Sequence, residues 1–115
     1  MKRTCRDYVA DILTCFQETQ EFTEDLDFKT FAKDRKTVNA VIRSLEVMSE
    51  AAKRIPPEVR EKHPKIPWKR MAGMRNKLIH EYSGVDMEIV WSVVKTELPP
   101  LKPHLEQMLR IVEKK

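Results

Sequence analysis

Apolar residues recur every three or four positions through the middle of the chain, and two adjacent prolines end the pattern. This spacing places the side chains on one face of an α-helix. Pro56 and Pro57 end the helix, because proline has no amide hydrogen and disfavours helical geometry in the preceding residue. The pattern therefore predicts a helix over residues 34–54, with Asp34 as its N-cap. Its apolar stripe comprises Val38, Val41, Ile42, Leu45, Met48, Ala52 and Ile55.

Similar stripes predict further helices on both sides of this segment, and only two glycines interrupt the 115 residues. Asp27 and Asp86 are well placed to cap two of these helices, and Ser83-Gly84 to end another. The expected ranges are residues 4–20, 28–33, 68–82, 87–97 and 101–114. The expected fold is therefore all-α, an up-and-down helical bundle of about five helices within a single domain, residues 1–115.

Four prolines lie between residues 56 and 67, where we expect a tight connector with one helical turn over residues 58–62. Ile66 and Trp68 look like packing residues. The connector is therefore not expected to be a linker between domains.

Composition narrows the class of protein. Hydrophobic residues make up 41% and charged residues 35%, a balance typical of globular proteins. No apolar stretch has the ~18 residues that a membrane span needs, and the N-terminal sequence does not resemble a signal peptide. We therefore expect a cytoplasmic protein without membrane contact. Cys5 and Cys15 lack the spacing of metal ligands, and we expect both to be free thiols.

Positive charge is concentrated in the second half of the chain. Residues 53–77 contain nine Lys and Arg residues against two Glu residues, although the whole chain carries a net charge of only +4. Such a segment attracts phosphate-rich ligands. It is equally typical of a solvated lysine-rich surface.

One dense group of polar residues lies late in the predicted third long helix, from Arg75 to Tyr82. Asn76 and His80 are four residues apart and share a face, so Asn76 can orient the imidazole. Arg75 and His80 are five residues apart, or about 140° around the helix axis. A symmetric dimer that pairs two copies of this helix across a cleft is one way to bring both groups to one point.

These residue types suit cleavage of a phosphodiester bond without a metal or other cofactor. Histidine acts as a general acid or base near neutral pH, and arginine binds phosphate oxygens with a planar fork of donors. In RNA, the 2′-hydroxyl is a built-in nucleophile. The alternative is structural, because Arg and His near a helix end often form a salt bridge or interact with the helix dipole.

The segment from Ile66 to Tyr82 resembles the HepT family, a branch of the HEPN superfamily of helical ribonucleases. The resemblance rests on Pro67-Trp68, Met74-Arg75-Asn76 and the pattern Arg75-x4-His80-x-Tyr82. Upstream, Ser49-Glu50-Ala51 is similar to the Gly-Glu-Ala of that family, with serine in place of glycine. The similarity extends over nearly the whole chain.

The resemblance implies a homodimeric, metal-independent ribonuclease that acts as the toxin of a toxin–antitoxin pair. Arg75 and His80 would be the catalytic pair. The implied partner is a minimal nucleotidyltransferase, the antitoxin, which inactivates the toxin by transferring AMP to Tyr82. A bulky anionic group there would crowd the cleft and compete with RNA phosphate for Arg75.

Several roles remain open from the sequence. Lys69 and Lys77 either contact the RNA backbone or are simply solvated, and Glu50 either orients Arg75 or forms a surface ion pair. Trp68 either stacks on a base or belongs to the core. A non-catalytic dimer that binds nucleotide or RNA beside a nucleotidyltransferase is the main alternative function, and a helical scaffold without nucleic acid is a weaker one.

Overall fold

The computed structural model describes residues 2–80 and 86–113, with the description of residues 78–80 and 113 confined to the backbone. Every regular element in these ranges is helical, which confirms the predicted all-α bundle. In chain order the elements are α1 (Cys5–Phe22), α2 (Phe28–Lys33), α3 (Arg35–Arg54), α4 (Pro57–Arg60), α5 (Trp68–His80), α6 (Met87–Ser92), η2 (Val93–Glu97), η3 (Pro99–Leu101) and α7 (Lys102–Glu113).

Side-chain caps set where the helices begin. Thr4 is the N-cap of α1 and forms a reciprocal capping box with Asp7, in which each side chain bonds the other residue's backbone amide. Asp27 and Asp34 accept backbone hydrogen bonds at the starts of α2 and α3, and Asp86 does so at α6, which confirms these three predicted caps. The helix predicted over residues 4–20 ends at Phe22, two residues later than expected.

The segment that follows α6 differs from the prediction of one continuous α-helix over residues 87–97. In η2 the Leu98 amide donates to the Val93 carbonyl at 2.9 Å, the spacing of a π-helix. This leaves the Val94 carbonyl available, and the side-chain amide of Gln20 donates to it at 2.6 Å. The wider turn precedes Pro99, which cannot donate an amide hydrogen. A contact from α1 therefore stabilises the departure from α-helical geometry.

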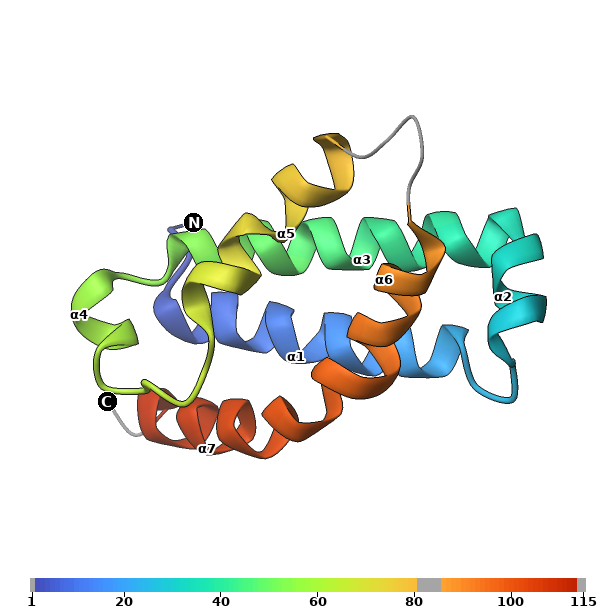
Figure 1. Ribbon diagram of the computed structural model, residues 1–115. Helices are drawn as coiled ribbons and strands as arrows, with labels where there is room; N and C mark the ends of the chain where they lie inside the picture. Colours follow the sequence, from blue (N-terminus) through green and yellow to red (C-terminus); the bar gives the residue numbers. More distant parts are fainter. Residues whose placement is uncertain (1, 81–85, 114–115) are drawn as a thin grey trace.

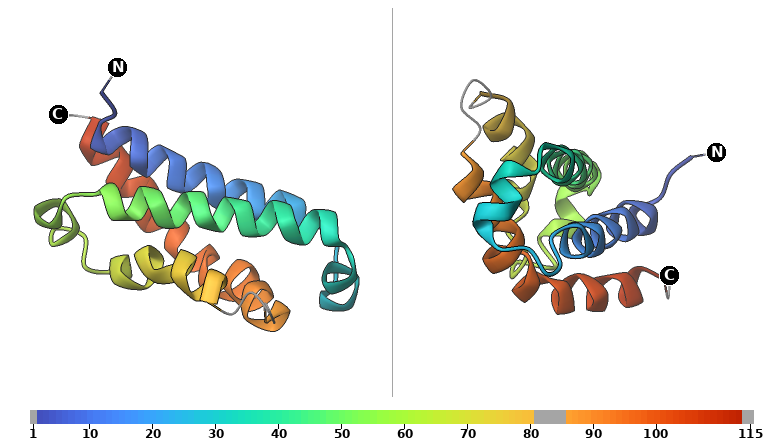
Figure 2. Two further views of the ribbon diagram at one scale, coloured as in Figure 1. Left: turned by 90° about the horizontal axis from the view of Figure 1, so that it is seen from above. Right: turned by 90° about the vertical axis from the view of Figure 1, so that its right-hand side faces the viewer.

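Four long helices enclose the core. α1 and α3 lie side by side along the molecule, while α7 packs against α1 and α5 packs against α3 (Figures 1 and 2). Side chains from all four helices are fully or almost fully buried, among them Ile12, Leu45, Met71 and Leu105. None of the described helices is long and apolar enough to cross a membrane.

The proline-rich connector is packed against the bundle as predicted, with Ile66 and Trp68 buried. Its predicted turn over residues 58–62 begins one residue earlier, as α4. The Arg60 side chain donates to the carbonyls of Ala52, Lys53 and Ile55 at 2.8 to 3.0 Å. These carbonyls lie at the end of α3, where a helix lacks amide donors of its own. The connector therefore caps α3 and holds the start of α5 in place.

Candidate active site

α5 carries the Arg75 segment, and its packing on α3 determines where Arg75 lies. Met71 and Met74 are buried against the core, and Arg75 directly follows Met74 on the exposed side of the helix. Trp68 is the first residue of α5. Its side chain is buried, and its indole nitrogen donates to the His63 carbonyl at 3.1 Å. This position supports Trp68 as a core residue and not as a platform for stacking a base.

A single serine of α3 connects directly to the backbone of α5 next to Arg75. The Ser49 hydroxyl donates to the Ala72 carbonyl at 2.8 Å and accepts from the Arg75 amide at 3.2 Å. Ser49 is fully buried. The HepT family, which the sequence resembles, usually has glycine at this position. The serine found here therefore adds a polar link between α3 and Arg75, the residue predicted to be catalytic.

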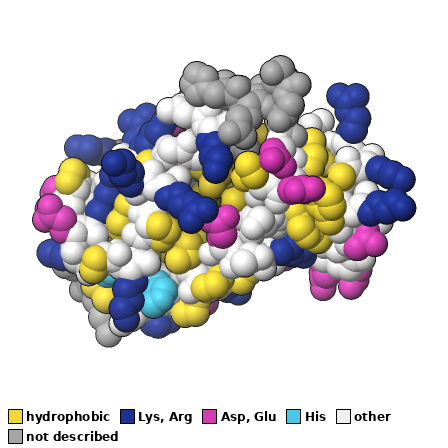
Figure 3. Space-filling view, in the orientation of Figure 1, with side chains coloured by type: hydrophobic (Ala, Val, Ile, Leu, Met, Phe, Trp, Pro, Cys, Tyr) yellow, Lys and Arg dark blue, Asp and Glu magenta, His cyan; other side chains and the backbone are white. Residues whose placement is uncertain are grey.

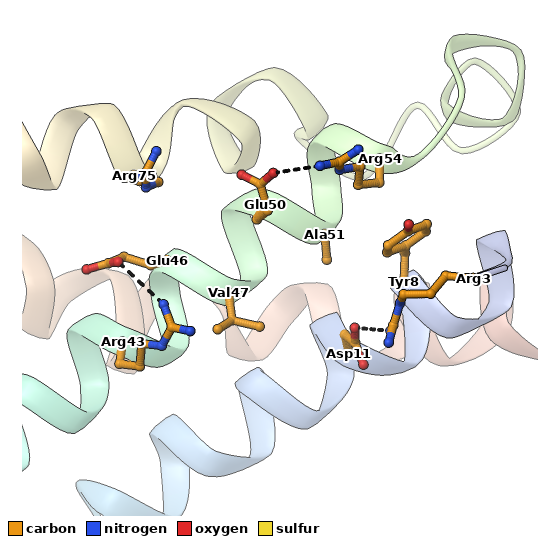
Figure 4. Close-up of a pocket in the computed structure, with 10 residues that line it drawn as sticks. All are labelled: Arg3, Tyr8, Asp11, Arg43, Glu46, Val47, Glu50, Ala51, Arg54 and Arg75. Carbon is orange, nitrogen blue, oxygen red and sulfur yellow. Dashed lines mark hydrogen bonds and ion pairs between the residues drawn. The ribbon is translucent and has the colours of Figure 1, made fainter. Parts of the chain in front are cut away.

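Arg75 opens onto a surface groove of about 670 Å³ between α1, α3 and α5 (Figure 4). We call this the arginine groove. Its lining residues are Arg3, Tyr8, Asp11, Arg43, Glu46, Val47, Glu50, Ala51, Arg54 and Arg75.

Three of the four arginines in the arginine groove are paired with carboxylates. Arg3 contacts Asp11, and its guanidinium also lies 5.2 Å from the centre of the Tyr8 ring. Arg43 lies 3.8 Å from Glu46 along α3. Among the described residues, no side chain forms a hydrogen bond or ion pair with the guanidinium of Arg75. Its donors are therefore available to a ligand in the groove.

Glu50 faces the arginine groove, but its carboxylate pairs with Arg54 at 3.4 Å and not with Arg75 (Figure 4). Both members of this pair are substantially exposed. The sequence left two roles open for Glu50, orienting Arg75 or forming a surface ion pair, and the structure shows the ion pair.

The other predicted site residues are only partly described. His80 is the last residue of α5, and its side chain lies outside the described residues, as does the whole of Tyr82. Asn76, Lys69 and Lys77 are exposed on α5. The structure therefore places Arg75, Asn76, Lys69 and Lys77 on the exposed surface of α5.

Part of the basic segment 53–77 has a structural role. Arg60 caps α3, Arg54 pairs with Glu50, and Arg70 forms an ion pair with Glu97 of η2. The cations left for a ligand within this segment are mainly lysines and Arg75. The sequence analysis did not include Arg43 and Arg54 in the candidate site. Their spacing places both residues on one face of α3, and this spacing was the signal that could have identified them.

The arginine groove has chemistry suited to phosphate. A guanidinium with free donors binds phosphate oxygens through two parallel hydrogen bonds and stabilises negative charge as it develops. Among the described residues, no group of three or more His, Cys, Asp or Glu side chains gathers as metal ligands do.

Comparison with known proteins decides the family. The model of the ribonuclease HepT-like family matches residues 12–108. The chain belongs to this family. HepT-like relatives include a protein of Thermococcus cleftensis named "Probable ribonuclease HepT", 46% identical over 94% of this chain and 98% of its own length. A protein of Methanocaldococcus jannaschii named "Putative RNase" is 44% identical over 99% of this chain and 98% of its own length.

The HepT-like match spans most of the bundle, including α3, α5 and seven of the ten residues that line the arginine groove; Arg3, Tyr8 and Asp11 precede it. No solved structure matches the chain. Membership of a ribonuclease family supports a nuclease activity, and it makes the Arg75 segment the leading candidate for the site of that activity.

Proposed function

We propose that this HepT-like chain is a metal-independent ribonuclease in which Arg75 and His80 form the catalytic pair. The observation that carries the proposal is the guanidinium of Arg75, which forms no ion pair with any described residue and lines a groove where the neighbouring arginines are paired. The family match and the names of the relatives support RNA as the substrate. Of the alternatives, a non-catalytic binding module requires neither Arg75 nor His80.

In the proposed reaction, the 2′-hydroxyl of the substrate attacks the adjacent phosphorus. A histidine imidazole takes the hydroxyl proton as general base. Arg75 binds the non-bridging oxygens and stabilises the charge that develops on them. The 5′-oxygen leaves as its bond to phosphorus breaks, and it takes a proton from an imidazolium acting as general acid. The products are a 2′,3′-cyclic phosphate and a free 5′-hydroxyl.

A homodimer supplies the two imidazoles in this scheme. His80 of one chain acts as the base, and His80 of the partner subunit acts as the acid. The angle of about 140° between Arg75 and His80 on one helix supports this arrangement, since one α5 alone points the two residues in different directions. The groove's mixture of positive and negative side chains is also suited to a two-fold interface, which must be self-complementary.

We further propose that the chain is the toxin of a toxin–antitoxin pair and that a nucleotidyltransferase antitoxin transfers AMP to Tyr82. The pattern Arg75-x4-His80-x-Tyr82 supports this regulation. An adenylyl group two residues from His80 adds a phosphate that competes with RNA for Arg75.

The catalytic proposal is tested by RNA cleavage with purified protein in the presence of EDTA. Wild-type protein is expected to cleave. Arg75→Ala and His80→Ala are each expected to reduce cleavage about 100-fold or more without loss of helicity, the first by loss of charge stabilisation and the second by loss of general acid–base catalysis. Lys33→Ala is the control, because it also removes an exposed cation, but from α2. Cleavage by a folded His80→Ala protein at the wild-type rate contradicts the assignment.

A further inference from the structure

We propose that a hollow between the connector and α7 is a second phosphate-binding site, which holds the RNA backbone away from the point of cleavage. This inference rests on the proposed ribonuclease function and extends it to the path of the substrate. The hollow has a volume of about 320 Å³. It is called the connector hollow below, and it is lined by Lys62, His63, Pro64, Lys65, Ile66, His104, Gln107 and Ile111.

The lining of the connector hollow is selective for anions. Its charged or titratable side chains are two lysines and two histidines, and Gln107 adds an amide donor. Among the described residues, no carboxylate lines it. Lys62 and Lys65 are exposed, and among the described residues neither forms an ion pair. Their ammonium groups are therefore available to phosphate, which is attracted without repulsion from an acidic neighbour.

Two other hollows of the protein contain carboxylates. The arginine groove contains three carboxylates. A hollow at the end of α1 is lined by Glu21, Glu24 and Asp25 together with lysines. Lysines therefore line more than one hollow of the protein. At the connector they occur together with histidines and, among the described residues, without a carboxylate.

The backbone that carries these side chains is well fixed. The His63 amide donates to the Arg60 carbonyl at 2.9 Å, and the His63 carbonyl accepts from the Ile66 amide at 3.2 Å and the Trp68 indole at 3.1 Å. Ile66 is buried beneath the connector. Both histidines are half-buried, and one comes from each side of the hollow. A pre-formed site of this kind loses little conformational entropy on binding.

The connector hollow also continues into a second concave surface, which suits a polymer better than a single phosphate ion. The neighbouring hollow, about 460 Å³ in volume, shares Lys62, His63 and Ile111 and reaches Thr4 and Arg6 at the start of α1. Within the part of the chain that the structure describes, its lining also contains no carboxylate. Figure 3 shows histidine beside Lys and Arg colouring at this end of the molecule.

The connector hollow is linked to Arg75 through the start of α5. Trp68 begins α5 directly after the connector, and its amide donates to the Ile66 carbonyl at 2.9 Å. Arg75 follows seven residues later, about 10 Å further along the helix axis. A single strand of RNA that occupies both sites therefore passes along α5, where Lys69 is exposed.

The test measures binding of a 20-nucleotide unstructured RNA to His80→Ala protein, so that cleavage does not interfere. Two exposed lysines are removed in Lys62→Ala/Lys65→Ala, and two exposed lysines of α2 are removed in the control Lys29→Ala/Lys33→Ala. Both variants lose the same charge. We expect the connector variant to bind about tenfold more weakly and its plot of log affinity against log salt to become shallower by about 1.4, the value for two lost phosphate contacts with a single strand. The control is expected to retain the slope of the parent His80→Ala protein.

The outcomes separate this inference from the proposed function. If wild-type protein cleaves RNA but the two variants have equal affinities and slopes, the connector hollow is not an RNA site and the ribonuclease proposal stands. If AMP or inorganic phosphate shifts the His63 and His104 imidazole signals in NMR spectra and the RNA does not, the hollow binds free phosphate groups and the backbone assignment is wrong. If wild-type protein neither binds nor cleaves RNA, both proposals fail.

Discussion

Ser49 offers a direct way to test how α3 positions Arg75. Ser49→Ala removes the two hydrogen bonds that its hydroxyl makes with the backbone of α5, at 2.8 and 3.2 Å. A typical intramolecular hydrogen bond contributes about 0.5 to 1.5 kcal/mol to stability. Both backbone partners lie inside a helix and have helical partners as well, so the low end of this range applies. We therefore expect a loss of about 1 to 2 kcal/mol.

For a chain of 115 residues, 1 kcal/mol corresponds to a decrease in Tm of about 4 °C. Ser49→Ala is therefore expected to melt about 4 to 8 °C below wild type in thermal denaturation followed by circular dichroism. The matched control is Ser44→Ala, because Ser44 is another buried serine of α3 but its hydroxyl donates to Glu18 of α1 at 3.2 Å and does not contact α5.

The kcat for RNA cleavage distinguishes an effect on the position of Arg75 from an effect on stability. At a temperature where all proteins are folded, Ser49→Ala is expected to lower kcat for RNA cleavage about threefold to tenfold, because small displacements of a catalytic group are costly. Ser44→Ala is expected to change kcat less than twofold. Equal kcat values for the two variants, or a Ser49→Ala protein as stable as wild type, would refute the positioning role.

Four further predictions concern other parts of the molecule. A chromogenic disulfide reagent at pH 8 is expected to react rapidly with Cys5 and slowly with Cys15, because burial raises the pKa of the Cys15 thiol to about 12; rapid reaction of both in the native protein contradicts this. Burial and Lys62 lower the pKa of His63 from its usual value near 6.5, so the unfolded chain binds this proton first and the free energy of unfolding is expected to fall as pH drops below about 6.5; a His63→Gln variant with the same pH dependence in urea titrations excludes His63 as its source. Leu45→Ala is expected to cost about 2 to 5 kcal/mol in the same titrations, and a loss below 1 kcal/mol indicates that the core is packed differently. Tyr82→Phe is expected to cleave RNA normally but to escape inactivation by the nucleotidyltransferase, and adenylylation of that variant to the wild-type extent would disprove the acceptor assignment.

Local rules predicted most of the fold. The apolar stripe and the prolines at 56–57 set α3 to within one residue, and Asp27, Asp34 and Asp86 act as the expected caps. The π-helical turn of η2 was not predictable in this way, because it depends on Gln20, which is 74 residues from its partner Val94. Sequence periodicity contains no information on such a long-range contact.

For the candidate site, the sequence indicated residue types more than their arrangement. The polar segment of α5 pointed to Arg75, which lines a groove and forms no ion pair with any described residue. The pairing of Glu50 with Arg54 has the i, i+4 spacing that favours ion pairs on a helix, but this spacing alone did not exclude a contact of Glu50 with Arg75. The link from Ser49 to α5 was also missed, since it becomes visible only when α3 and α5 are packed together.

The most direct test of the central claim is cleavage of RNA by purified wild-type and His80→Ala proteins, with EDTA present and the intact mass of each protein recorded. The proposal predicts that unmodified wild-type protein cleaves, leaving 2′,3′-cyclic phosphate ends, and that folded His80→Ala protein does not. Absence of cleavage by unmodified, folded wild-type protein, or equal cleavage by the two proteins, contradicts it.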